Sequence, residues 1–181
     1  MSHPATDSAA AQKAFADIKK SPLISIPALL MVVVYYVVYI ILWKLSLEGN
    51  ISNWLAATIA SLISYLAFTP SHGAMRRAVS RVSWVNETML RLGTFVAVPF
   101  GSGKLFRIMH MQHHRFANDH KDPDHALSSN LRYILVWGIW PFLYLWTWAR
   151  NKDQYPPIKF YNVWGEVAVG MAVIVTAFWF F

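Results

Sequence analysis

Three histidines stand close together in the sequence as His110-Met-Gln-His113-His114. On an α-helix, residues three and four positions apart share one face, so these imidazoles would point the same way. Imidazole is a good ligand for iron, zinc, copper and nickel. His113 and His114 diverge by about 100° around a helix axis, which lets them address two different metal ions. A single histidine would be read as a surface group, but this spacing predicts a metal site.

The cluster lies in a long polar segment, residues 71–130, which holds six of the seven histidines. Ser102, between two glycines, is a suitable N-cap and predicts a helix from Lys104 to Phe116. His72 stands at the start of the same polar segment, just after an apolar run. It is a candidate ligand from a second helix, because the fold must bring distant ligands together.

The composition predicts a membrane protein. Apolar residues make up 56% of the chain and charged residues only 14%, whereas a soluble domain is about 25% charged. This balance excludes a soluble enzyme and a disordered tail. Cysteine is absent, which excludes disulfides and thiolate ligands. In such a chain the net charge of +7 indicates anchoring at the cytoplasmic side of a membrane rather than nucleic-acid binding.

We expect an all-α integral membrane protein, with a polar tail over residues 1–21 and one membrane domain over residues 22–181. A helix of about 20 apolar residues crosses a bilayer. Four apolar runs predict four transmembrane helices in two hairpins, joined by a cytoplasmic helical loop that carries the histidines: residues 22–43, 54–68, 131–148 and 163–181. Pro141 is expected to kink the third helix, and residues 94–100 are expected to lie at the membrane interface.

Lysine and arginine favour the cytoplasmic side of a membrane, so the amino terminus and the histidine loop are both expected there. Arg150, Lys152 and Lys159, in the last connection, run against this rule. Glu166 lies one turn inside the fourth apolar run and is expected to reach back to the interface.

The sequence from Pro70 to His125 resembles the membrane fatty acid desaturase family. Its members are non-haem di-iron enzymes with three histidine boxes, roughly HxxxH, HxxHH and HxxHH. The cluster at residues 110–114 matches the second box in full, and Asp122-Pro123-Asp124 also resembles the family. The first box is His72-Gly-Ala-Met-Arg76, where arginine replaces a histidine. A guanidinium stays protonated and cannot ligate iron.

The third box does not occur within the 181 residues, and the sequence is apolar to its last residue. We expect the chain to be the amino-terminal part of a longer protein, with the third box beyond residue 181. An in-frame HxxHH in the DNA past codon 181 would support this. With the ligand set incomplete, the 181-residue chain alone is expected to bind iron weakly and to show no turnover.

The resemblance implies an O2-dependent lipid desaturase that introduces a double bond into an acyl chain, with two non-haem iron ions. The matching ligands are His72, His110, His113 and His114. The implied partners are a membrane lipid and an electron donor, either a ferredoxin or a b-type cytochrome with a reductase, which the basic loop would attract. Two alternatives stay open: a related di-iron hydroxylase or carotenoid ketolase, and a non-catalytic metal-binding membrane protein.

Other polar residues of the loop are weaker candidates. His120 and His125 are possible additional ligands, with a solvated loop as the equal alternative. Asp119, Asp122 and Asp124 could accept the second N–H of a ligating histidine and so fix its tautomer. Because Asp-Pro-Asp is more often a plain turn, we favour the turn.

Overall fold

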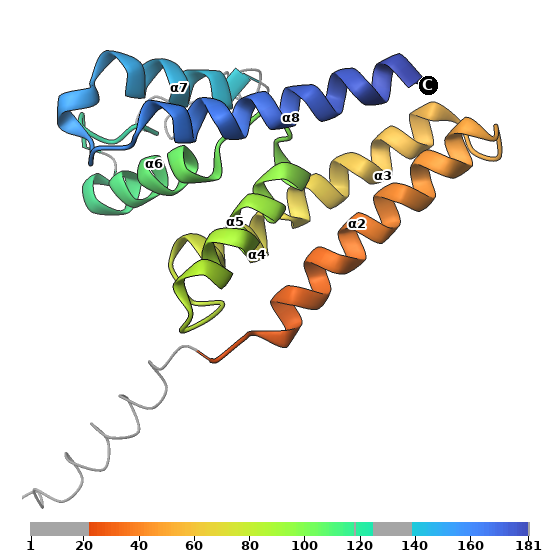
Figure 1. Cartoon of the computed structure of the whole chain (residues 1–181), viewed down its shortest axis with the longest axis horizontal. Helices are drawn as coiled ribbons and strands as arrows, with labels where there is room; N and C mark the ends of the chain where they lie inside the picture. The colour runs from red at the N-terminus through yellow and green to blue at the C-terminus, as the bar shows by residue number, and fades with distance from the viewer. Residues whose placement is uncertain (1–21, 118, 125–138, 181) are drawn as a thin grey trace, which may run out of the picture.

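The structure is a computed structural model that describes residues 22–117, 119–124 and 139–180. Within these ranges the chain is helical and contains no strand, as predicted. The first two helices form a hairpin, shorter helices lie to its left in the view, and the long last helix extends along the top of the view (Figure 1). The helices are α2 (Ile26–Leu47), α3 (Asn53–Leu66), α4 (Phe68–Met75), α5 (Ser83–Ala97), α6 (Gly103–Phe116), α7 (Trp140–Arg150) and α8 (Phe160–Phe180), with a 3-10 turn, η3, at Lys152–Gln154. The predicted tail, residues 1–21, lies outside the described residues.

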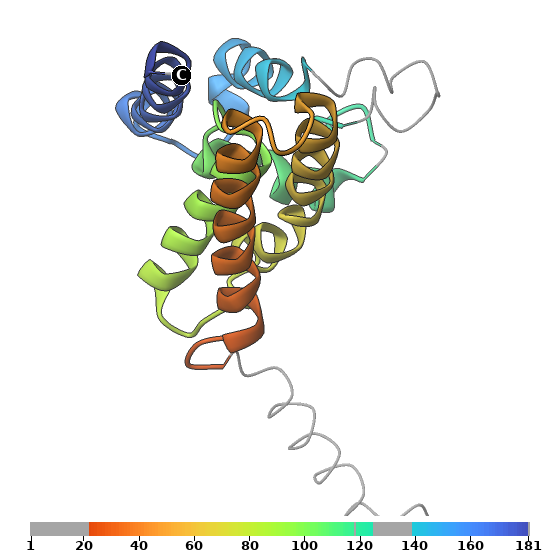
Figure 2. The same cartoon turned by 90° about the vertical axis from the view of Figure 1, so that its right-hand side faces the viewer.

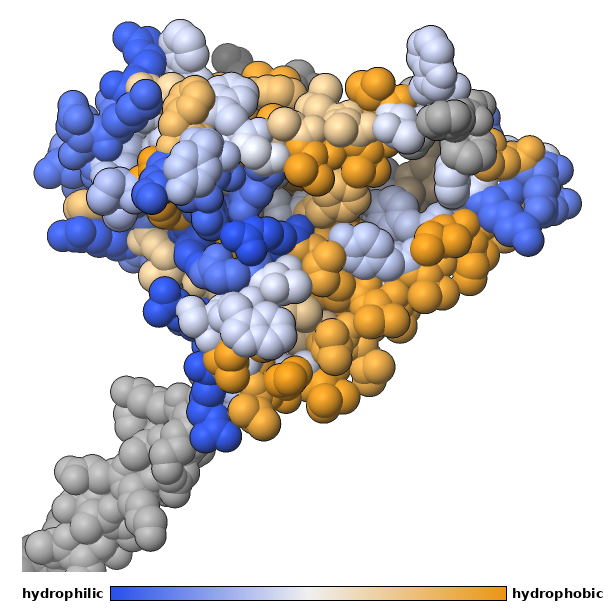
Figure 3. Space-filling model, viewed as in Figure 1, coloured by the Kyte–Doolittle hydropathy of each residue, from blue (hydrophilic) through white to orange (hydrophobic). Residues whose placement is uncertain are grey.

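Two helices are long and apolar enough to cross a membrane: Ile26–Leu47, and Asn53–Met75, which joins α3 to α4. At 1.5 Å per residue, the 22 residues of α2 extend over about 33 Å, which matches a bilayer core. Leu30, Val34 and Ile40 are exposed on α2. This apolar surface is visible along the hairpin, whereas hydrophilic residues gather at the other side (Figure 3). The two helices correspond to the first predicted hairpin.

The second helix continues past residue 68, where the predicted apolar run ends, and past Pro70. Proline cannot donate a hydrogen bond to the carbonyl four residues before it, which here is Leu66. The hydroxyl of Tyr35 donates to that carbonyl at 3.4 Å. The chain bends at Ala67 and continues as α4, so the helix carries His72 on its last turns.

The start of α2 is tied to the loop that follows α4. The backbone N–H of Ser25 donates to the Val79 carbonyl at 2.8 Å, and that of Arg81 donates to the Pro22 carbonyl at 2.8 Å. The first residues of α2 and the last residues of α4 therefore lie at the same end of the hairpin, opposite the α2–α3 turn.

Residues 94–97 are the last turn of the 15-residue helix α5, not part of a separate interfacial segment. Leu90 is completely buried and Met89 nearly so, and both pack in one cluster with Met75 of α4. Because the first half of α5 contains polar residues, the helix does not form a continuous apolar run and was not predicted.

The second predicted hairpin is not confirmed. Residues 131–138 lie outside the described residues, and α7 has only 11 residues, about 16 Å, too short to cross a bilayer. Pro141 stands in the first turn of α7, where proline is tolerated. Trp148 of α7 and Val163 of α8 pack against Leu105 of α6. Both helices thus lie beside α6 (Figure 2).

Candidate metal centre

The end of α4 is held by a well-formed helix cap. The N–H of Arg77 donates to the Ala74 carbonyl at 3.1 Å, and that of Ala78 donates to the Gly73 carbonyl at 2.9 Å. Arg77 has a φ of 57°, the left-handed conformation that closes a helix in this pattern. This cap fixes the last turn of α4, which carries His72.

The helix α6 presents the histidine cluster, as the spacing predicted. Ser102 is its N-cap and accepts a hydrogen bond from the N–H of Leu105 at 3.3 Å. His110 is buried, with 8% of its surface exposed, whereas His114 is exposed. The helix therefore directs one imidazole into the protein and leaves another at the surface.

Three imidazoles from the two helices meet at one point. His72, His110 and His114 each offer a ligand atom, and these atoms lie within 4.8 Å of one another. The ring of His110 is 4.8 Å from that of His72 and 4.5 Å from that of His114, centre to centre. The Nε2 atoms of His110 and His114 are 3.0 Å apart.

The donor set fits a metal ion. With metal–nitrogen distances of about 2.1 Å, two nitrogens at right angles around one ion lie about 3 Å apart, close to the separation of the His110 and His114 Nε2 atoms. Burial, followed by the charges of His72 and His114, lowers the pKa of His110 to about 4. At neutral pH this imidazole is uncharged, which is the form that ligates a metal.

His113 points to a different set of partners. Its Nδ1 lies 3.0 Å and 3.1 Å from the two carboxylate oxygens of Asp122 and 3.6 Å from Asp124. Asp124 also accepts hydrogen bonds from the Tyr144 hydroxyl at 2.7 Å and from the Trp140 indole at 3.3 Å. The Asp-Pro-Asp segment does form a turn, but our preference for a plain turn missed this contact with the histidine helix.

The outer candidates do not join either group in the described part of the chain. His120 pairs with Asp119 at 2.8 Å, and their side chains are 80% and 49% exposed. His125 lies outside the described residues. Arg76, at the position where the family has a histidine, is exposed, and its positive charge helps to lower the pKa of His110.

A family model for fatty acid desaturases matches residues 50–181, more than half of the chain. The chain belongs to the fatty acid desaturase family. The match includes both α4 and α6, and hence all four predicted histidine ligands of this desaturase-family chain. No curated protein and no solved structure matches the chain.

Glu166 joins three helices through its carboxylate. Its carboxylate accepts hydrogen bonds from Arg91 Nε at 2.7 Å, the Ser102 hydroxyl at 2.7 Å and the Lys104 N–H at 3.3 Å, partners that the sequence did not predict. A negative charge at a helix N-terminus is stabilising. Glu166 thereby joins α8 to α5 and to the first turn of the histidine helix α6.

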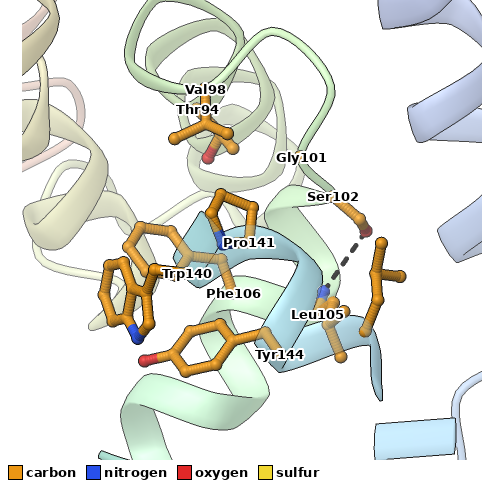
Figure 4. A pocket seen from close by; sticks show the side chains of 10 residues that line it. Thr94, Val98, Gly101, Ser102, Leu105, Phe106, Trp140, Pro141 and Tyr144 are labelled. Carbon is orange, nitrogen blue, oxygen red and sulfur yellow. Dashed lines mark hydrogen bonds between the residues drawn. The ribbon is translucent and has the colours of Figure 1, made fainter. Parts of the chain in front are cut away.

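A small apolar cavity of about 30 Å³ lies between α5, α6 and α7, beside the histidine helix. Thr94, Trp140 and Tyr144 contribute to its lining (Figure 4). Phe106 also lines the cavity, and its ring lies 6.4 Å from that of His110, centre to centre. The surroundings of the histidines on this side are therefore aromatic.

The position of His72 depends on a close approach between α4 and α5. A Cβ at Gly93 would lie 2.2 Å from the Oγ of Ser71, which is completely buried. Gly93→Ala must turn the Ser71 hydroxyl away from the Ala67 carbonyl or move α4 off α5. We expect it to weaken cobalt(II) binding about tenfold, as displaced supports of metal ligands do. Titration followed by the visible absorption of cobalt(II) measures this.

The rescue variant Ser71→Ala/Gly93→Ala removes the hydroxyl that clashes. We expect it to bind cobalt(II) almost as tightly as the unmodified chain. Unchanged binding in Gly93→Ala alone would show that this contact does not position His72.

Proposed function

We propose that this desaturase-family chain acts on the acyl chain of a membrane lipid and introduces a double bond with O2 and two histidine-held iron ions. The observation that carries the proposal is the meeting of His72 with His110 and His114, which follow it by 38 and 42 positions on another helix. His113 completes the set as a ligand on the Asp122 side. Iron bound here would supply the O2-dependent oxidation of an unactivated C–H bond.

The residues around the centre prepare it for that task. The buried His110 is uncharged at neutral pH, the form in which an imidazole ligates a metal. A carboxylate accepts rather than donates, so Asp122 favours a proton on Nδ1 of His113, which leaves its Nε2 for a metal. Phe68 and Phe106 lie within 6.5 Å of His110, centre to centre. They exclude water from that side and orient an apolar substrate.

Two surfaces of the protein suit the proposed partners, a membrane lipid and an electron donor. The exposed apolar faces of α2 and α3 suit a lipid environment, from which an acyl chain reaches the centre. Basic side chains are exposed on the α4–α5 loop and after the histidines: Arg76, Arg77, Arg81, Arg115 and Lys121. These would attract an acidic electron donor such as a ferredoxin or a b-type cytochrome with its reductase.

The proposal is tested by expressing the whole open reading frame that encodes this chain and analysing the cellular lipids by mass spectrometry. New double bonds, together with iron in the purified protein, support desaturation. Hydroxylated or keto products would instead assign the chain to the related oxygenases. Purified protein without iron would favour the non-catalytic alternative.

The orientation in the membrane yields a separate prediction. The scheme of four spans in two hairpins puts Lys159 on the side opposite the histidines. The packing of Val163 against α6 instead supports a position of Lys159 on the same side as the histidines. That position would also bring Arg150 and Lys152 into agreement with the charge rule. We propose that Lys159, the histidines and residue 22 all face the cytoplasm.

Since the chain has no cysteine, single cysteines report sidedness directly. In sealed vesicles of known orientation, Lys159→Cys should react with an impermeant maleimide from the same side of the membrane as Arg81→Cys. Asn50→Cys should react only from the other side. Reaction of Lys159→Cys together with Asn50→Cys would restore the scheme of four spans.

A further inference from the structure

Arg107 of α6 contacts two other helices at once. Its Nη1 forms an ion pair with Glu87 of α5. Its Nη2 donates a hydrogen bond to the Ala74 carbonyl of α4 at 3.1 Å. The side chain is largely buried, with 16% of its surface exposed, and that of Glu87 is 25% exposed. This single guanidinium therefore joins the two helices that carry the histidines, with α5 between them.

The contacts lie next to the candidate ligands on both helices. Arg107 precedes His110 by three residues, or about one turn, and so lies on the same face of α6. Ala74 follows His72 by two residues, on the last turn of α4. A movement of either helix that changed the separation of His72 and His110 would have to stretch or break the Arg107 contacts.

The chemistry of the side chain suits this role. A guanidinium is planar and presents several donors in fixed directions, so it can serve a carboxylate and a carbonyl at the same time. The Ala74 carbonyl already accepts the N–H of Arg77 at 3.1 Å. A lysine has the charge but lacks the fixed fork, and it cannot hold both acceptors in the same geometry.

We propose that Arg107 is a positioning residue that sets the spacing between His72 on α4 and the histidines of α6. The inference rests on the proposed metal centre for its consequence, because the three imidazoles can share one ion only at this spacing. The ion pair with Glu87 and the hydrogen bond to Ala74 have separable effects. The ion pair fixes α6 on α5, and the hydrogen bond fixes α6 on α4.

A purely stabilising role can be distinguished with a double variant. Arg107→Met alone leaves the carboxylate of Glu87 without its partner, which destabilises the fold. Glu87→Gln/Arg107→Met removes both charges and is expected to recover most of the lost melting temperature. It does not recover the hydrogen bond to Ala74, so the histidine spacing stays uncontrolled.

The first measurement is cobalt(II) binding to the full chain, followed by visible absorption. We expect Glu87→Gln/Arg107→Met to bind about tenfold more weakly than the unmodified chain and with a shifted spectrum, in the range found for residues that support metal ligands. Arg107→Lys should fall between the two. Arg115→Met is the matched control, since Arg115 is an exposed arginine on the same helix, and its affinity should not change. Cobalt binding by the double variant equal to that of the unmodified chain would overturn the proposal.

The second measurement needs no metal. The rings of Phe68 and Phe106 lie 6.1 Å apart, centre to centre, across the same helix pair. In the cysteine-free chain, Phe68→Cys with Phe106→Cys supplies two thiols for a short bifunctional maleimide. Cross-linking should be several-fold slower when Glu87→Gln/Arg107→Met is added. Equal rates would overturn the role of Arg107. If the unmodified chain binds no cobalt(II), the proposed metal centre fails, and the cross-linking rate still decides whether Arg107 sets the spacing.

Discussion

Replacing His110 by alanine is expected to abolish metal binding while leaving the helices of the chain intact. His110 is the central ring of its group, and its Nε2 lies 3.0 Å from that of His114. Its loss leaves only His72 and His114 of the three imidazole ligands, so cobalt(II) affinity should fall by at least about 100-fold. Titration of the purified full chain measures the affinity, and circular dichroism measures the helix content.

His120→Ala is the matched control for this prediction. His120 belongs to the same loop region, but its side chain is 80% exposed and pairs only with Asp119 among the described residues. Its replacement should leave cobalt(II) affinity unchanged. Equal losses in the two variants would mean that the chain binds metal through surface histidines and not through the three-imidazole group.

Gly170→Ala is expected to destabilise the protein, by about 2–3 kcal/mol, because an added methyl group would overpack a tight contact. A Cβ at Gly170 would lie 1.7 Å from the carbonyl oxygen of Pro99, a backbone atom that cannot rotate away. The helix α8 would have to move off the loop between α5 and α6. Thermal unfolding in detergent, followed by circular dichroism, measures the change.

Gly165, in the same helix, supplies the comparison. A Cβ there meets no atom within 4 Å, so Gly165→Ala should stabilise α8 by about 0.5–1 kcal/mol through its better helix propensity. The two substitutions are chemically identical and should have opposite signs. A stabilising effect at both positions would show that α8 does not rest on Pro99.

The histidine group is the part of the site that sequence best predicted. The spacing of His110, His113 and His114 is a local property of one helix, so the periodicity of the α-helix was enough to put the three rings near one face. The split between His114, beside His72, and His113, beside Asp122, also follows from the angle between neighbouring positions. What spacing could not give is which acidic residue approaches which ring.

The supports of the site were not predictable in the same way. Arg107 meets Glu87 across 20 positions, and Arg91 meets Glu166 across 75. Such pairs depend on how helices pack, and nothing in the local pattern distinguishes them from other charged residues. From the sequence, Glu166 was expected to extend its charge towards the membrane interface. In the structure its partners are the N-terminus of α6 and Arg91 of α5.

The bounds of α4 and α5 also differ from those that the apolar runs predicted. A hydropathy search responds to continuous apolar sequence, whereas α5 alternates buried residues such as Leu90 with polar ones. It also stops at a proline, although Tyr35 satisfies the carbonyl that Pro70 leaves free. The continuation into α4 matters most, because His72 lies on it.

The two backbone bonds between residues 22–25 and 79–81 have a consequence for biogenesis. The ribosome makes α2 well before it makes residues 79–81, so the first helix must emerge with its leading end still untied. That end is secured only after the hairpin has returned and α4 has been synthesised. Under the proposed metal centre, the three-imidazole group would form later again, since α6 is made after α4, and a nascent chain arrested before residue 110 has only His72 of that group to offer.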